Sequence, residues 1–218
     1  AALADGVSTV QNVALSQDIE ATLRCMAALG ASWERTDKST LRVTGIGGKR
    51  KPFPELPRFD CGESGSTLRF FIPLALDGRG PVRLIGHGRL MQRPLTVYQN
   101  LFAPLGVVWR QAGDALTVEG ELKSGRFELP GDVSSQFISG LLLALPLLAA
   151  DSTLCVLPPV ESRPYIDITL DVMRSFGVQV DEWDENCFFI PGQQHYAARV
   201  AAVEGDWSNA AFLLALGE

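Results

Sequence analysis

The residues best suited to bind a ligand are Ser134, Ser135 and Gln136, which follow a loop-like run and lead directly into an apolar segment. Where a loop becomes a helix, the first backbone amides have no intrahelical partners and the helix dipole is positive. Amides and hydroxyls at such a helix start suit a phosphate group. A serine in this place can also simply cap a buried helix. The three residues therefore predict either a phosphate site or a helix cap.

Two arginines, Arg93 and Arg163, each precede a proline at the start of a predicted helix. Proline suits the first helical turn, so each pair can mark helix initiation and nothing more. An arginine beside exposed helix amides also suits a carboxylate or phosphate. Ser162, Arg163 and Tyr165 form one polar cluster at such a helix start, which keeps the anion-binding interpretation open.

Other chemistries have weaker support. The Gly-rich run at 45–50 lacks the spacing of a nucleotide-binding loop and has Arg50 where Ser or Thr would bind magnesium. The run at 62–66 lacks the final glycine of a nucleophile elbow. With only two histidines, His87 and His195, the sequence builds neither a metal cluster nor a histidine-based triad easily.

Three similar segments, at 18–30, 94–106 and 165–177, must carry these residues. Each has apolar residues on one face at helical spacing and ends in a glycine suited to the left-handed position after a helix. Each is followed by two short β-rich runs around a polar turn, which predicts a hairpin. The repeated unit is therefore helix, strand, turn, strand.

A second series of helices is predicted at 64–76, 134–145 and 207–216, each entered through a glycine and a hydroxyl residue. These helices are apolar nearly all round, so we expect them to be buried while the first series covers the outside. Both series repeat at about 70 residues. The pattern predicts a single domain, spanning 1–218, with approximate threefold symmetry.

Composition limits the class of protein. The 218 residues are 46% hydrophobic with a net charge of -6, which disfavours a nucleic-acid surface. The longest apolar run, at 137–150, contains Pro146 and is too short for a membrane span. The four cysteines have no paired spacing, so we expect reduced, mostly buried thiols in a cytoplasmic protein. A start without Met and an end within a helical pattern suggest a piece of a longer chain.

Five motifs identify the chain as similar to a known family. They are DCGESGSTLR at 60–69, RLMQRP at 89–94, SSQF at 134–137, SRPYIDIT at 162–169 and EGDWS at 204–208. In this order they resemble the 5-enolpyruvylshikimate-3-phosphate synthases. The resemblance implies one of that fold's two α/β domains, built from three βαβαββ units with buried parallel helices and outer sheets. It covers the N-terminal, shikimate 3-phosphate-binding domain, without the hinge-crossing strands and the C-terminal domain.

The resemblance also implies roles for individual residues. Shikimate 3-phosphate would contact Ser134, Ser135, Gln136, Ser162 and Tyr165. Phosphoenolpyruvate would contact Gly65, Ser66, Arg93 and Gln136. The implied reaction transfers the enolpyruvyl group to the 5-hydroxyl of shikimate 3-phosphate and releases phosphate, in aromatic amino acid biosynthesis. No metal or organic cofactor, nucleic acid or membrane is expected.

The resemblance leaves parts of the enzyme outside this chain. The family's general acid and base residues belong to the C-terminal domain, so we expect the chain to fold and bind but not to turn over. Glu63 and Phe70 stand where many relatives have Asn and Pro. Both flank the loop that would shape the phosphoenolpyruvate side, so the resemblance does not extend to glyphosate sensitivity. Three alternatives remain: a UDP-N-acetylglucosamine enolpyruvyl transferase, a non-catalytic phosphate-binding domain, and an RNA 3'-phosphate cyclase relative. The first usually has a reactive cysteine where 88–93 has none, and the acidic pI disfavours the last.

Overall fold

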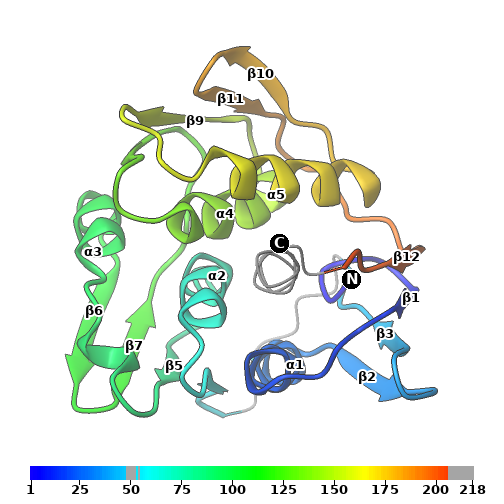
Figure 1. The fold of residues 1–218 in the computed structure, drawn as a ribbon. Helices are drawn as coiled ribbons and strands as arrows, with labels where there is room; N and C mark the ends of the chain where they lie inside the picture. The colour runs from blue at the N-terminus through cyan, green and yellow to red at the C-terminus, as the bar shows by residue number, and fades with distance from the viewer. Residues whose placement is uncertain (48–52, 54, 206–218) are drawn as a thin grey trace, which may run out of the picture.

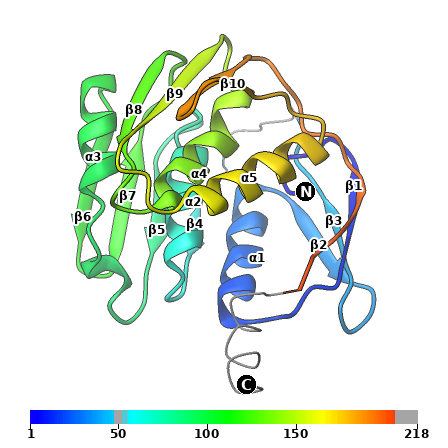
Figure 2. The same cartoon turned by 45° about the horizontal axis from the view of Figure 1, so that its top comes forward.

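Three small sheets lie around the outside of the molecule, and the helices α2 and α4 lie in the middle (Figure 1). The structure is a computed structural model that describes residues 1–47, 53 and 55–205. The predicted helix at 207–216, the end of the motif at 204–208 and residues 48–50 of the Gly-rich run lie outside the described residues. A second view shows the same arrangement, with α4 and α5 side by side (Figure 2).

Each outer helix, α1, α3 and α5, is followed along the chain by a pair of strands, as the repeated unit predicts. The helices are α1 Gln17–Leu29, α2 Gly65–Ala75, α3 Thr96–Phe102, α4 Ser135–Ala144 and α5 Arg163–Ser175. The 3-10 segments are η1 Leu90–Gln92, η2 Ala103–Leu105 and η3 Leu145–Leu147. The strands are β1 Val7–Gln11, β2 Ser32–Arg35, β3 Leu41–Thr44, β4 Arg58–Asp60, β5 Val82–Ile85, β6 Val108–Ala112, β7 Ala115–Glu119, β8 Arg126–Pro130, β9 Ser152–Leu157, β10 Asp181–Asp184, β11 Cys187–Ile190 and β12 Val200–Ala202.

All three sheets share one topology. Their strand orders are β12-β1-β3-β2, β4-β5-β7-β6 and β8-β9-β11-β10. In each sheet the first two strands are parallel and the last two form an antiparallel hairpin. Parallel neighbours need a crossover, which the helices α2 and α4 supply in the second and third sheets. The expected α/β fold with pseudo-threefold βαβαββ units is confirmed, and β12 completes the first sheet.

The outer helices α1, α3 and α5 form where the apolar periodicity predicts them. α1 is capped at its start by Ser16, whose side chain accepts a hydrogen bond from Ile19 N at 3.3 Å. Gly30, Gly106 and Gly177 adopt φ values of 116°, 73° and 82° after the helices, a conformation that residues with a Cβ adopt at a cost. The α-helical part of α3 is shorter than predicted and continues as the 3-10 segment η2.

The inner helices α2 and α4 are buried, as their apolar sequences predict. Eight residues of α4 are buried, and Phe137, Leu141 and Leu142 are at most 1% exposed. Each helix begins at a serine cap: Ser64 accepts from Thr67 N and Ser134 accepts from Gln136 N. None of the described helices has both the length and the apolar character needed to cross a membrane.

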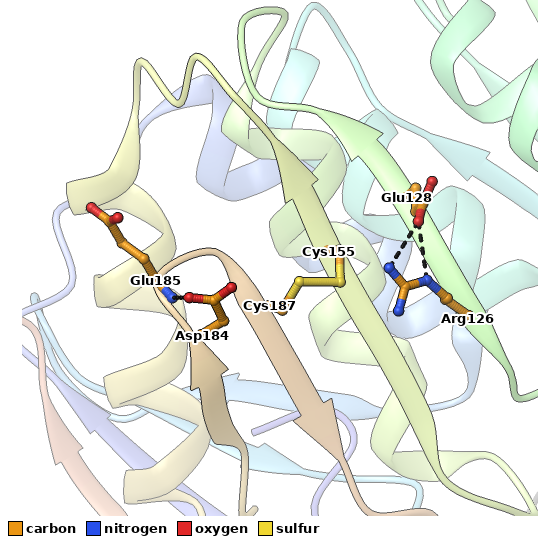
Figure 3. The surroundings of a disulfide bond; sticks show 6 residues. All are labelled: Arg126, Glu128, Cys155, Asp184, Glu185 and Cys187. Atoms are coloured by element: carbon orange, nitrogen blue, oxygen red, sulfur yellow. Dashed lines mark hydrogen bonds and ion pairs between the residues drawn. A yellow bond between two sulfur atoms is a disulfide. The ribbon is translucent and has the colours of Figure 1, made fainter.

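The expectation of four reduced cysteines is wrong for two of them. Cys155 on β9 and Cys187 on β11 form a disulfide (Figure 3). The antiparallel register places them directly opposite each other, with their Cα atoms 4.1 Å apart, and such a pairing cannot be read from a sequence separation of 32. Cys25 and Cys61 are free and buried, as expected. Disulfides are rare in reducing compartments, so this bond does not support the predicted cytoplasmic location.

Reduction of this disulfide should destabilise the folded chain. The bond closes a loop of 32 residues, and loss of such a cross-link costs about 3–4 kcal/mol in the chain-entropy model. We expect the urea midpoint to fall when a dithiol reductant is added. A Cys155→Ser, Cys187→Ser double variant should match the reduced protein and show no response to the reductant. Equal midpoints with and without reductant in the unsubstituted protein would contradict the prediction.

Candidate active site

A groove of about 630 Å³ lies between α2, α4 and α5. The side chains from the first turns of these helices are polar, and those further along them are mainly apolar. The lining residues are Ser66, Phe70, Ser134, Ser135, Gln136, Ser139, Leu143, Ser162, Tyr165, Ile168, Thr169 and Val172. All five residues predicted to contact shikimate 3-phosphate therefore share one groove, and Ser66 from the phosphoenolpyruvate set joins them, while Gly65 and Arg93 do not line it.

The parallel strands β8 and β9 bring Ser134, Ser135 and Ser162 together. Both strands end at the same edge of their sheet, where Pro130 pairs with Leu157. The two loops that follow are tied by backbone hydrogen bonds, from Gly131 N to Leu157 O at 2.9 Å and from Glu161 N to Gly131 O at 3.2 Å.

Gly131 allows these two loops to approach each other. A Cβ at this position would lie 2.7 Å from the carbonyl oxygen of Pro159 and 2.8 Å from that of Leu157. Both neighbours are backbone atoms, which cannot move aside as a side-chain end could. The absence of a side chain at Gly131 therefore lets the starts of α4 and α5 lie next to each other.

Hydroxyl groups are the main donors at this end of the groove. The Ser134 side chain accepts from Gln136 N at 3.3 Å, and the Ser134 carbonyl accepts from Phe137 N at 3.2 Å. Two first-turn amides are thus already satisfied. Within the described residues, neither Ser135 nor Ser162 forms a side-chain hydrogen bond. Their hydroxyls, and the proton of the Ser134 hydroxyl, remain for a ligand.

Tyr165 and Thr169 form the α5 side of the groove. Tyr165 is 58% exposed and lines the groove. Thr169 donates to the Tyr165 carbonyl at 2.9 Å, so it accepts the 2.7 Å hydrogen bond from Ser139. This contact ties α5 to α4, so the wall that carries Tyr165 is held at a fixed distance from the serines.

Arg163 has a structural role rather than an anion-binding one. Its guanidinium bonds Asp167 at 2.7 Å, Glu182 at 2.8 Å and the Glu185 carbonyl. The hydrogen bond with Asp167, followed by that with Glu182, raises the pKa of Arg163 above its usual value. Of the two interpretations of the Arg163-Pro pair, the structure favours the one in which the arginine fixes the start of α5, here against the β10–β11 hairpin.

A second polar cluster adjoins the serines and contains the remaining predicted residues. A Cβ built on Gly65 would lie 2.9 Å from Nη1 of Arg69, 2.9 Å from Nη1 of Arg93 and 3.5 Å from Oε1 of Gln136. Two guanidinium groups and an amide therefore occupy the space next to Gly65 and approach its backbone closely because it has no side chain. Because Gln136 also lines the serine end, it borders both clusters.

Arg69 is a site residue that the motif analysis missed. Its Nη1 donates to Gln136 Oε1 at 2.6 Å, and its guanidinium lies 4.8 Å from the Phe137 ring centre. Burial, and to a smaller extent the charge of Arg93, lowers the pKa of Arg69. Its Nε is buried without a hydrogen-bond partner among the described residues. Two neighbouring cations with spare donors favour a bound anion.

The sequence did contain a signal for Arg69. It follows Gly65 by one helical turn on α2, and residues with this spacing lie on the same helix face. Once the run at 62–66 is placed at a helix start, the side chain one turn later points along the same face. What the sequence could not supply is the proximity of Arg93, which comes from the separate segment between η1 and α3.

Two polar clusters, one of hydroxyl groups and one of guanidinium groups, share one glutamine. The chain matches, over residues 1–217, the family model described as EPSP synthase (3-phosphoshikimate 1-carboxyvinyltransferase). It belongs to the EPSP synthase family. A 3-phosphoshikimate 1-carboxyvinyltransferase of Clostridium novyi (strain NT) is 40% identical over 227 residues, which cover 100% of this chain and 52% of that protein. One of Clostridium botulinum (strain Eklund 17B / Type B) is 44% identical over 218 residues, covering 98% and 50%.

The fold is also that of an EPSP synthase domain. A solved EPSP synthase from Acinetobacter baumannii superimposes with a TM-score of 0.82 at 23% identity, covering 98% of this chain and 47% of that one. At this identity the likeness concerns the fold alone. The chain spans about half the length of the EPSP synthase relatives it matches.

Proposed function

We propose that this chain is the substrate-binding half of an enzyme that transfers the enolpyruvyl group of phosphoenolpyruvate to the 5-hydroxyl of shikimate 3-phosphate. The observation that carries the proposal is the convergence of Ser134, Ser135 and Ser162 beside Gln136, with Arg69 and Arg93 across Gln136. Two phosphorylated substrates must lie next to each other for this reaction. Two anion-binding clusters in contact through one side chain meet that requirement.

The serine cluster suits the phosphate of shikimate 3-phosphate. Hydroxyl donors without protein acceptors gain full hydrogen bonds to a phosphate, and bonds to a charged group contribute about 1.5–3 kcal/mol each. The positive end of the α4 dipole adds to this attraction. Tyr165, which lines the groove on α5, would then contact the ring of the substrate, and Gln136 would lie between the two ligands.

The arginine cluster suits phosphoenolpyruvate, which carries a phosphate and a carboxylate. Guanidinium groups bind both through paired hydrogen bonds. In the reaction the 5-hydroxyl oxygen of shikimate 3-phosphate adds to C2 of phosphoenolpyruvate while C3 gains a proton. Loss of phosphate from the resulting tetrahedral adduct, with loss of a C3 proton, restores the enolpyruvyl group. Residues of this chain would bind and orient both anions through these steps.

The group that transfers protons in this reaction would lie outside the groove. In the part of the chain that the structure describes, no carboxylate, imidazole or amine lines the groove, although the reaction needs a group that can gain and lose a proton. We infer that the rest of the polypeptide supplies it, and that residues 1–218 bind the substrates without turning them over. Phosphate release from both substrates by this chain alone would contradict this. A role in aromatic amino acid biosynthesis belongs to the same proposal.

Calorimetry with shikimate 3-phosphate and with UDP-N-acetylglucosamine tests the proposed substrate class. Shikimate 3-phosphate titrated into residues 1–218 should release or absorb measurable heat with one binding site. UDP-N-acetylglucosamine at the same concentration should give none, because the serine cluster is built for one compact phosphate. Binding of the nucleotide sugar in preference to shikimate 3-phosphate would overturn the proposal in favour of a cell-wall enolpyruvyl transferase.

A further inference from the structure

Four hydroxyl groups form a continuous chain from the outer helix α1 to the groove. Ser66, which lines the groove, has its Oγ 3.2 Å from Ser64 Oγ. Ser64 Oγ is 2.9 Å from Thr67 Oγ1, which is 2.7 Å from Thr22 Oγ1 on α1. Ser64 and Thr67 are each 1% exposed. The two central hydroxyls are therefore closed to bulk water, and their protons must be shared among these four groups and nearby backbone atoms.

Counting protons fixes the direction of this chain. A hydroxyl has one proton to donate and two lone pairs to accept with. Ser64 Oγ accepts from Thr67 N at 3.3 Å and from Thr67 Oγ1 at 2.9 Å. Both lone pairs of Ser64 are then occupied, so its own proton goes to Ser66 Oγ.

Ser66 consequently accepts a hydrogen bond from the protein side. Its own proton has no acceptor among the described residues and is left for the groove that Ser66 lines, next to Gly65, which Arg69 and Arg93 approach. An anion bound next to Ser66 would therefore accept a hydrogen bond from the Ser66 hydroxyl. If the chain ran in the opposite direction, the Ser66 proton would point to Ser64 and a lone pair would face the anion.

We propose that Thr67 is a positioning residue for the anion bound beside Ser66, because its hydroxyl sets the direction in which Ser66 donates. Thr67 does not line the groove and acts through Ser64. This inference rests on the proposed function, in which that anion is phosphoenolpyruvate. Hydrogen bonds in such a chain polarise one another, so the donor at the groove end is strengthened by those behind it.

Thr67→Val removes this control with little other damage. The substitution keeps the β-branched shape and the backbone N–H that Ser64 caps. Thr22 keeps the Asp18 carbonyl, 3.0 Å away, as an acceptor for its proton. One lone pair of Ser64 then becomes free and can accept the Ser66 proton, which turns that proton away from the groove. The dissociation constant of phosphoenolpyruvate should rise about five-fold, the effect of one modest hydrogen bond.

Thr22→Val is the matched control from the other end of the chain. Without the Thr22 hydroxyl, the Thr67 proton has Ser64 as its acceptor, so the direction toward Ser66 is kept. The affinity for phosphoenolpyruvate should therefore stay unchanged. A simple loosening between α1 and α2 would instead weaken binding in both variants alike, because each substitution removes the Thr22–Thr67 hydrogen bond. Thr67→Ser restores the hydroxyl and should restore the affinity.

The experiment is an amide NMR titration of residues 1–218 with phosphoenolpyruvate at saturating shikimate 3-phosphate, following Gly65 and Ser66. We expect weaker phosphoenolpyruvate binding for Thr67→Val alone, with the shikimate 3-phosphate affinity equal in all four proteins. Equal phosphoenolpyruvate affinity in Thr67→Val and the unsubstituted chain would overturn this inference and leave the proposed function standing. If neither ligand shifts any amide of the unsubstituted chain, both fail.

Discussion

Replacing Ser135 and Ser162 together by alanine should lower the affinity for shikimate 3-phosphate roughly 100-fold, since each hydroxyl bond to a phosphate is worth about 1.5 kcal/mol or more. Neither hydroxyl forms a hydrogen bond within the described residues. Their removal therefore deletes ligand contacts without leaving a protein group unpaired. Ser134, which caps α4, stays in place. Calorimetry on the double variant measures the loss.

A matched control lies at the other end of α5. Ser175 donates to the Val172 carbonyl in the last turn of this helix and does not line the groove. Ser175→Ala should leave the affinity for shikimate 3-phosphate unchanged. The melting temperature of the double variant should also stay close to that of the unsubstituted chain. An unchanged affinity in the Ser135→Ala, Ser162→Ala variant would refute the proposed phosphate site.

Gly140→Ala should be the most destabilising single substitution among the residues discussed. At this point α4 crosses α2, and an added Cβ would lie 2.5 Å from the Arg69 carbonyl oxygen and would also overlap the Tyr98 hydroxyl. Alanine gains up to about 1 kcal/mol in helix propensity over glycine. Overlap with backbone that cannot move aside outweighs this, and we expect a net loss of about 3 kcal/mol in the free energy of unfolding.

The Gly140→Ala substitution should also disturb the candidate active site. Tyr98 is fully buried and donates to the Phe137 carbonyl at 2.7 Å, next to Gln136. Moving Tyr98 or α2 would displace Gln136 from Arg69. Gly205→Ala is the control, because an added Cβ there meets no atom of the described residues within 4 Å. Urea unfolding of both variants tests the prediction, and equal midpoints would show that the helix crossing can relax.

Local sequence patterns were sufficient for the helices. The apolar face and the terminal glycine of α1 and α5 predict amphipathic helices, and the nearly uniform apolar character of α4 predicts its burial. The parallel strands were harder to predict because they are short. β4 has only three residues and β12 also has three, too few for an alternating pattern to stand out.

Contacts between residues far apart in the sequence could not be predicted either. The pairing of Cys155 with Cys187 depends on the register of β9 against β11, which the sequence does not show. The meeting of Arg69 with Arg93 likewise depends on how α2 lies against the segment before α3. Residues Ser134 to Gln136 could be proposed from the sequence because they are contiguous. The role proposed for Thr67 could not, since it depends on two neighbouring hydroxyls and a proton count.

A crystal structure of residues 1–218 with shikimate 3-phosphate would test the central claim most directly. We predict phosphate oxygens at hydrogen-bonding distance, about 2.5–3.0 Å, from the hydroxyls of Ser134, Ser135 and Ser162. The ring should lie against Gln136 and Tyr165. A phosphate bound elsewhere, for example between Arg69 and Arg93 with the three serines unoccupied, would contradict the account.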